Sequence, residues 1–236
     1  MSRRIAAIVD SLFRSDASLR SYYETLDVNE QARADGFADE QLRRRFIAGR
    51  FLLRAVLARY LDCAPASVRL ETGDQGKPRL AGDHPLKFNL SHSGDSLAIA
   101  LSWECEVGID IERARPGISR DIESIAAHAF PSQIGRRIAA LPPARRSAAF
   151  YRQWTKQEAI LKARGTGFSP VALSSAPSAV TVRELALGRG WFAAVAAEAD
   201  DFELSVFYGF GTMDFTKPGR YSPASLAARK APEIHR

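Results

Sequence analysis

The chain has 236 residues, 46% of them hydrophobic and 25% charged, so it can bury one large core or two small ones and is too apolar for wholesale disorder. Its 33 Lys and Arg outnumber its 27 Asp and Glu, which gives a net charge of +6. That charge favours acidic partners without choosing among nucleic acid, phosphorylated small molecules and acidic proteins. Two cysteines, Cys63 and Cys105, exclude a disulfide framework and a cysteine-rich zinc site.

No apolar run in the sequence reaches the roughly 18 residues that a membrane span needs. Residues 5–9 are apolar and follow Arg3 and Arg4, as in a short signal peptide, but Asp10 interrupts the run. Together with the low cysteine content, this leads us to expect a cytoplasmic protein.

Residues 40–61 are predicted to form an amphipathic helix. One face carries its apolar side chains at 3.6-residue spacing: Leu42, Phe46, Leu53, Val56, Leu57 and Tyr60. Arg43, Arg50 and Arg54 follow one another at spacings of seven and four beside that face. Such a stripe is either a solvated basic face or a row of guanidinium groups that binds phosphate.

Short β-rich runs separated by Gly, Asp and Pro come next, at 68–71, 86–90, 97–101 and 107–111. Residues 120–164 are predicted to be helical, with breaks at Pro131 and Pro142, and three further β-rich runs follow at 180–187, 191–197 and 202–208. The order of helix and then strands occurs twice. It predicts an α+β fold of two similar halves, 1–112 and 113–236, with a cleft between them and a mobile basic tail after about residue 216.

Two carboxylates, Asp110 and Glu112, lie two residues apart in a predicted strand. Both therefore point to one face, while Ile109 and Ile111 point to the other and are expected to be buried. The pattern is either an ordinary amphipathic strand or a pair of hard oxygen ligands, because a divalent cation such as Mg²⁺ relieves the repulsion between the two charges.

A third carboxylate, Glu158, shares a helix face with Lys162 at i and i+4. The pair lies just beside a predicted apolar stripe formed by Phe150, Trp154 and Leu161. It is either a surface ion pair or the third ligand of a cation site with a lysine directed at the same anion.

Residues 88–95 read Phe-Asn-Leu-Ser-His-Ser-Gly-Asp and bring Ser91 next to His92. Adjacent strand residues point to opposite faces, so these two cannot form a nucleophilic dyad. His92 is either a satisfied structural group or a donor to a phosphate, which small neighbours would allow to approach. The Gly76-Lys77-Pro78 segment lacks the Ser or Thr of a P-loop and is expected to be a turn that presents Lys77.

Four of these motifs, taken in order, resemble the 4′-phosphopantetheinyl transferases, and more narrowly the long, surfactin-synthetase-activating type. They are Gly76-Lys77-Pro78, Asn89-Leu90-Ser91-His92-Ser93, Gly108-Ile109-Asp110-Ile111-Glu112 and Trp154-x-x-x-Glu158-Ala159-x-x-Lys162-Ala163-x-Gly165. The resemblance covers about residues 43 to 168 and implies a pseudo-dimer of two α+β halves. It implies transfer of 4′-phosphopantetheine from coenzyme A to a serine of an apo acyl or peptidyl carrier protein, which leaves adenosine 3′,5′-bisphosphate.

The resemblance also implies a role for each catalytic residue. Asp110, Glu112 and Glu158 would hold Mg²⁺, or Mn²⁺, against the pyrophosphate of coenzyme A. Lys162 would contact that phosphate and help the leaving group depart. Glu158 is the nearest candidate for the base that takes the serine proton, directly or through a water.

The implied coenzyme A contacts are Arg50, Lys77, Ser91 and His92, with His92 on a phosphate, most simply the 3′ group. Arg43 and Arg54 are further candidates for coenzyme A contacts, supported only by their position in the helix stripe. Gln157 departs from the family, because many members have Lys or Arg directly before the metal-binding Glu. The nearest basic residue here, Lys156, is displaced by about 100° around the helix.

The implied partner is an acidic carrier protein of a fatty-acid, polyketide or peptide pathway, and the implied state is a monomer without nucleic-acid or membrane partners. The charge of +6 would then speed the encounter at low salt. A Mg²⁺-dependent nuclease is an alternative. Such an enzyme would be expected to have aromatic residues interleaved with basic ones along a groove, and the sequence shows no such interleaving. A non-catalytic nucleic-acid-binding module would leave the three carboxylates without a purpose.

Overall fold

The computed structural model describes residues 3–12, 15–73, 77–114, 122–165 and 179–209. The first part of the chain forms β1 (Arg3–Ser11), α1 (Asp16–Thr25), α2 (Val28–Asp35), α3 (Glu40–Leu61) and a short 3₁₀ turn (Pro65–Ser67). The strands β2 (Leu70–Thr72), β3 (Pro78–Leu80), β4 (Lys87–Ser93), β5 (Ser96–Ser102) and β6 (Val107–Arg113) follow. Two predicted features lie outside the described residues: the turn residue Gly76 and the tail after residue 216.

The second part forms α4 (Ile122–Ala129), α5 (Ser132–Ala139), α6 (Pro143–Arg164), β7 (Thr181–Leu185), β8 (Trp191–Ala197) and β9 (Phe202–Tyr208). The predicted helix over 40–61, the breaks at the prolines and the β-rich runs are thus confirmed. Helix α6 starts at a proline, whose missing N–H costs nothing in the first turn, and ends at Gly165 in a left-handed conformation with φ 65°.

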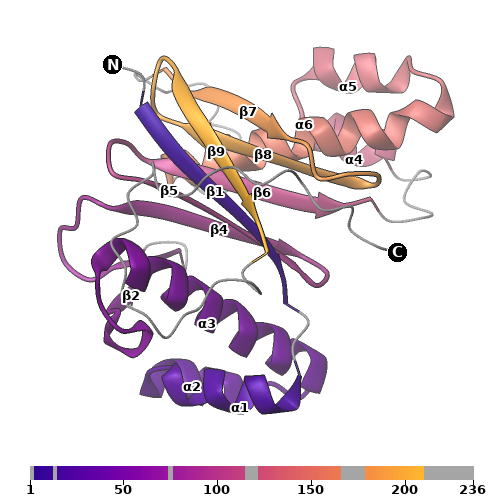
Figure 1. Ribbon diagram of the computed structural model, residues 1–236. Coiled ribbons are helices and arrows are strands. Elements are labelled where there is room, and N and C mark those ends of the chain that lie inside the picture. Colours follow the sequence, from indigo (N-terminus) through magenta and orange to yellow (C-terminus); the bar gives the residue numbers. More distant parts are fainter. Residues whose placement is uncertain (1–2, 13–14, 74–76, 115–121, 166–178, 210–236) are drawn as a thin grey trace.

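The strands form two main sheets, ordered β4-β5-β1-β9 and β6-β8-β7 (Figure 1). All neighbours in them are antiparallel except β1 and β9, which run parallel. The α+β prediction is confirmed. Each sheet takes one strand from the other end of the chain, because β9 pairs with β1 and β6 pairs with β8. The boundary near residue 112 remains our proposal for the division into halves.

Strand β1 was not predicted from the sequence, because residues 5–9 suggested a failed signal peptide. It lies inside the first sheet with both faces buried: Ala6 and Ile8 join one core cluster, while Ile5, Ala7 and Val9 join the other. A strand covered on both faces has a continuous apolar run instead of an alternating one.

The layers follow from these cores. Helices α1 and α3 pack on one face of the first sheet, and the other face packs on the β6-β8-β7 sheet (Figure 1). Helix α6 covers the remaining face of that second sheet through Ala159 and Ala163. Gly108 permits this approach, because a Cβ there would lie 2.0 Å from the carbonyl oxygen of Ala159. No helix in the described ranges is both long and apolar enough to cross a membrane.

The arginine stripe of α3 is not a single anion-binding row, which corrects part of the prediction. Arg54 is 1% exposed and binds the carboxylates of Asp27 at 2.6 Å and Glu30 at 2.7 Å. It also donates to the carbonyl oxygens of Pro65 and Val68, so its guanidinium is committed inside the core. Arg43 binds Asp35 and lies over the ring of Tyr23, which ties α3 to the preceding helices.

Replacing Arg54 with Leu is therefore expected to lower the free energy of unfolding by about 3–5 kcal/mol, because it removes the buried positive charge that pairs with the buried Glu30 and with Asp27. Urea unfolding measures the change. Arg44→Ala is the matched control on the same helix: Arg44 pairs with the exposed Asp16, and its loss should cost less than about 1 kcal/mol. Equal stability of the two variants would contradict a structural role for Arg54.

Candidate active site

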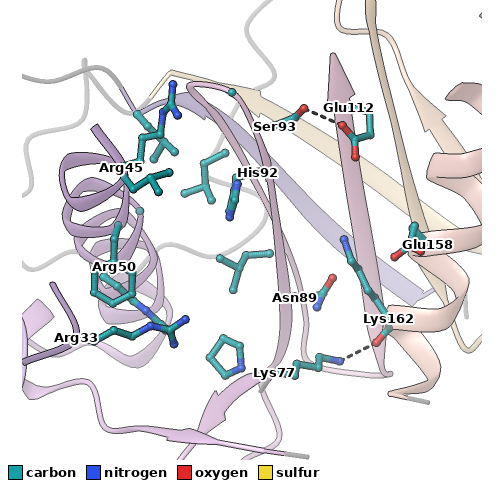
Figure 2. Close-up of a pocket in the computed structure, with 18 of the residues that line it drawn as sticks. Arg33, Arg45, Arg50, Lys77, Asn89, His92, Ser93, Glu112, Glu158 and Lys162 are labelled. Carbon is teal, nitrogen blue, oxygen red and sulfur yellow. Dashed lines mark hydrogen bonds between the residues drawn. The ribbon is translucent and has the colours of Figure 1, made fainter. Parts of the chain in front are cut away.

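A cavity of about 820 Å³ opens between α3, β4, β6 and the C-terminal part of α6 (Figure 2). This volume is typical of sites for cofactors and drug-sized ligands. Basic side chains from several elements line it: Arg33, Arg45, Arg50, Lys77, His92 and Lys162. Two carboxylates, Glu112 and Glu158, lie at its far side, so the cavity combines a cationic wall with an acidic end.

Strand β4 supplies side chains of two kinds in alternation. Ser91 and Ser93 are buried and bond to residues of β6, whereas the exposed His92 points into the cavity (Figure 2). The prediction that Ser91 and His92 face opposite ways is confirmed. Partial desolvation of the His92 ring in the cavity, together with the positive charges of Lys162 and Arg45, lowers the pKa of His92 against an opposing effect of Asp110.

Strand β6 presents the two predicted carboxylates on the side facing β4 and α6. Asp110 is 3% exposed, and its Oδ1 accepts hydrogen bonds from the Ser91 hydroxyl at 2.8 Å and from Lys162 Nζ at 2.6 Å. Glu112 Oε2 accepts a hydrogen bond from the Ser93 hydroxyl at 2.8 Å. Ile109 and Ile111 belong to the core between the sheets, as predicted.

Helix α6 brings Glu158 and Lys162 to the same place. Burial raises the pKa of Glu158, and the nearby charges of Asp110 and Glu112 raise it further, while Lys162 opposes them. Glu158 therefore lies close enough to Asp110 and Glu112 to be affected by their charges. Glu158 and Lys162 do not form only a surface ion pair with each other, because Lys162 also binds Asp110 on β6.

The fit of a divalent cation can be judged from these contacts. Among the residues that the structure describes, no three His, Cys, Asp or Glu side chains are grouped closely enough to hold a metal ion. Asp110 Oδ2, however, is buried with no hydrogen-bond partner in the described part of the chain, and all three carboxylates are hard oxygen donors. The donor set fits Mg²⁺ provided that Glu158 approaches β6 and Lys162 releases Asp110.

The predicted coenzyme A contacts are only partly brought together. Arg50, Lys77 and His92 line the cavity, and Lys77 Nζ donates to the carbonyl oxygen of Lys162 at 2.9 Å, so it joins the β3 edge to α6. Burial lowers the pKa of both Arg50 and Lys77. Ser91 is different, because it lies behind the cavity wall and is bonded to Asp110 and Lys162.

Three residues that line the cavity were missed as site residues: Arg33, Arg45 and Phe46. Arg33 and Arg50 place their guanidinium carbons 5.3 and 5.5 Å from the centre of the Phe46 ring, and Arg45 binds Asp95 at 2.8 Å. Phe46 was placed on the apolar face of its helix, and Arg33 lies in a region without a motif. Charge could have indicated the two arginines, and the position of Phe46 between Arg43 and Arg50 in the sequence could have indicated the ring.

Gln157 has a structural place. It is 5% exposed and donates a hydrogen bond to the carbonyl oxygen of Ala129 at 2.8 Å, which ties α6 to the last residue of α4. The neighbouring Lys156 binds Glu184 on β7 at 2.6 Å. Neither of these two side chains lines the cavity in the described structure.

Replacing Glu158 with Gln is expected to raise thermal stability at neutral pH. The raised pKa means that the folded state disfavours the charged carboxylate, and this penalty is full above the folded-state pKa and vanishes as the pH falls below the unfolded value of about 4.5. The difference in Tm between variant and wild type should therefore shrink from pH 7.5 to pH 4. A variant less stable than wild type at pH 7.5 would contradict the assigned environment.

Comparison with known proteins gives the same family for both parts of the chain. Residues 14–104 match the family model described as 4′-phosphopantetheinyl transferase, N-terminal, and residues 106–206 match that of the 4′-phosphopantetheinyl transferase superfamily. The matches extend beyond the region of the four motifs on both sides.

Individual relatives agree. The 4′-phosphopantetheinyl transferase HetI of Nostoc sp. is 37% identical over 161 residues, which cover 67% of this chain and 67% of HetI. The 4′-phosphopantetheinyl transferase AcpT of Salmonella typhi is 41% identical over 152 residues, or 61% of this chain and 72% of AcpT. A phosphopantetheinyl transferase of Thraustochytrium sp. is 34% identical over 166 residues, or 64% and 57% of the two chains. The chain therefore belongs to the 4′-phosphopantetheinyl transferase superfamily and is an enzyme that transfers the phosphopantetheine group to carrier proteins.

Proposed function

We propose that the chain takes the group from coenzyme A, delivers it to a serine hydroxyl of an apo carrier protein with the help of Mg²⁺, and is of the long, surfactin-synthetase-activating type. One observation carries the proposal: Glu112, Glu158 and Lys162 line one end of a cavity, Asp110 is bonded to Lys162 there, and basic side chains stand among the apolar residues of the remaining lining. A cationic wall suits the phosphates of coenzyme A, and the carboxylates suit a cation beside them.

The reaction forms a bond between the serine oxygen and the phosphorus of the phosphopantetheine group and breaks the bond to adenosine 3′,5′-bisphosphate. Mg²⁺, when bound by Asp110, Glu112 and Glu158, would supply positive charge against the pyrophosphate. Lys162, once released from Asp110, reaches the cavity with its proton at Nζ and stabilises charge on the leaving phosphate. Glu158 is the nearest candidate to accept the serine proton, directly or through a water.

We assign Arg50, Lys77 and His92 to direct contacts with coenzyme A, because all three line the cavity. Ser91 is better placed to act through Asp110, to which its hydroxyl is bonded. The net charge of +6 supports an acidic carrier as the protein partner. The free thiols of Cys63 and Cys105 support a cytoplasmic location, and we propose a monomer on family grounds.

The intact mass of an apo carrier protein, measured after incubation with this protein, coenzyme A and Mg²⁺, tests the function. We expect a gain of one phosphopantetheine group that is lost when EDTA is present. Fatty-acid, polyketide and peptide carriers belong in the same series. No gain with any of them would refute the proposal, and cleavage of DNA or RNA in a parallel incubation would favour the nuclease alternative.

His92→Ala is expected to raise the KM for coenzyme A about tenfold or more with little change in kcat. The reason is that a hydrogen bond to a charged phosphate is worth about 1.5–3 kcal/mol. His128→Ala is the control, since His128 lies on α4 and bonds to the carbonyl oxygen of Ser124. An unchanged KM in the His92 variant would show that this side chain does not contact coenzyme A.

A further inference from the structure

Strands β4 and β6 lie side by side but belong to different sheets, and side chains join them. Asn89 Oδ1 accepts a hydrogen bond from the backbone N–H of Ile109 at 2.9 Å. The Ser91 hydroxyl accepts one from the N–H of Ile111 at 3.4 Å, and the Ser93 hydroxyl accepts one from the N–H of Arg113 at 3.1 Å. We call Asn89, Ser91 and Ser93 the side-chain ladder.

The side-chain ladder has a constant register. Each member accepts from the residue 20 positions later, so the two strands run in the same direction and advance together by two residues per rung. In an ordinary sheet a backbone carbonyl would accept these N–H groups. Here side chains replace it, which leaves room for the cluster between β4, β6 and α6.

Each serine of the side-chain ladder also holds a carboxylate. The Ser91 hydroxyl donates to Asp110 and the Ser93 hydroxyl donates to Glu112, both at 2.8 Å (Figure 2 shows the second bond). A hydroxyl has one proton to donate and lone pairs to accept with, so one atom can do both tasks. Each serine thus fixes a carboxylate and the backbone N–H that follows it.

We propose that Ser93 is a positioning residue that orients Glu112 toward the proposed cation, and that the side-chain ladder sets the register of β6 that this orientation needs. The inference rests on the proposed role of Glu112 as a metal ligand. Ser93 is the informative member, because Ser91 also accepts a hydrogen bond from Lys162 and its loss would disturb two groups. Partners that orient a metal ligand commonly contribute 10- to 100-fold to metal affinity.

The test compares Ser93→Ala, Ser93→Thr and Ser96→Ala, the last being the residue of β5 that faces Ser93 across the hairpin. Binding of Mn²⁺ is measured from the electron paramagnetic resonance signal of the free ion, with coenzyme A present. We expect about tenfold weaker binding in Ser93→Ala and near wild-type binding in the other two. At saturating Mg²⁺ the KM for coenzyme A should be unchanged in all three.

Hydrogen exchange of the Arg113 amide is the second readout, because it does not depend on the metal. Exchange should speed up in Ser93→Ala and return toward the wild-type rate in Ser93→Thr. If the methyl group of threonine disturbs the strand, the difference in Mn²⁺ binding between Ser93→Ala and Ser96→Ala still tests the positioning role.

Two results would overturn the inference, and they can be told apart. Wild-type Mn²⁺ affinity in Ser93→Ala would refute the positioning role alone. No binding of Mn²⁺ by the wild-type protein would refute the metal assignment, and the positioning role with it.

Discussion

Asp110→Asn is expected to lower kcat about a thousandfold or more while the protein stays folded. Asp110 is 3% exposed, its Oδ2 has no hydrogen-bond partner among the described residues, and its Oδ1 binds Lys162. Its neutral isostere keeps the shape but removes the negative charge that a cation needs, and losing electrostatic stabilisation of a phosphoryl transition state costs several kcal/mol, where each 1.4 kcal/mol is tenfold in rate. Single-turnover transfer to an apo carrier at saturating coenzyme A measures the change.

The control for Asp110 is Asp201→Asn. Asp201 is an exposed carboxylate paired with Arg183, and its loss should leave kcat unchanged. Far-UV circular dichroism and urea unfolding show whether the Asp110 variant is folded. A kcat of Asp110→Asn within a factor of three of wild type would contradict the assignment of Asp110 to the cation site.

Gly108→Ala is expected to destabilise the protein by about 3 kcal/mol or more and to reduce transfer strongly. The added Cβ would lie 2.0 Å from the carbonyl oxygen of Ala159 and 2.4 Å from the backbone nitrogen of Ala163. Both obstacles are backbone atoms, so α6 itself must move, and overpacking of this kind costs about 1–3 kcal/mol or more. Glu158 and Lys162 move with that helix, away from Asp110.

Gly49→Ala is the control for this substitution. A Cβ at residue 49 meets only a methyl group of Leu12 at 3.7 Å, an ordinary contact, and alanine is the better helix former by about 1 kcal/mol. Urea unfolding should therefore show Gly49→Ala to be as stable as wild type or more so. Equal stability of the two variants would contradict the close contact between β6 and α6.

Much of the site could be predicted because it depends on local periodicity. The spacing of two between Asp110 and Glu112 placed both carboxylates on one face of a strand, and the i, i+4 spacing placed Glu158 and Lys162 on one face of a helix. What could not be predicted depends on contacts between segments far apart in the chain. The hydrogen bond between Ser93 and Glu112 joins strands of different sheets, and no local sequence pattern indicates it.

The arginines of α3 show the same limit. Charge spacing groups Arg43, Arg50 and Arg54 together, yet Arg54 is buried because Asp27 and Glu30 of the preceding helix region neutralise it, whereas Arg50 faces the cavity. Strand β1 was not predicted for a different reason. Its two faces belong to two cores, so its sequence carries no alternation to read.

The most direct test of the account is the anomalous scattering of Mn²⁺ in crystals grown with coenzyme A. The account predicts one peak within about 2.0–2.4 Å of carboxylate oxygens of Asp110, Glu112 and Glu158, with Lys162 turned from Asp110 to a phosphate. A peak elsewhere, or a Lys162 that still binds Asp110 while coenzyme A fills the cavity, would contradict it.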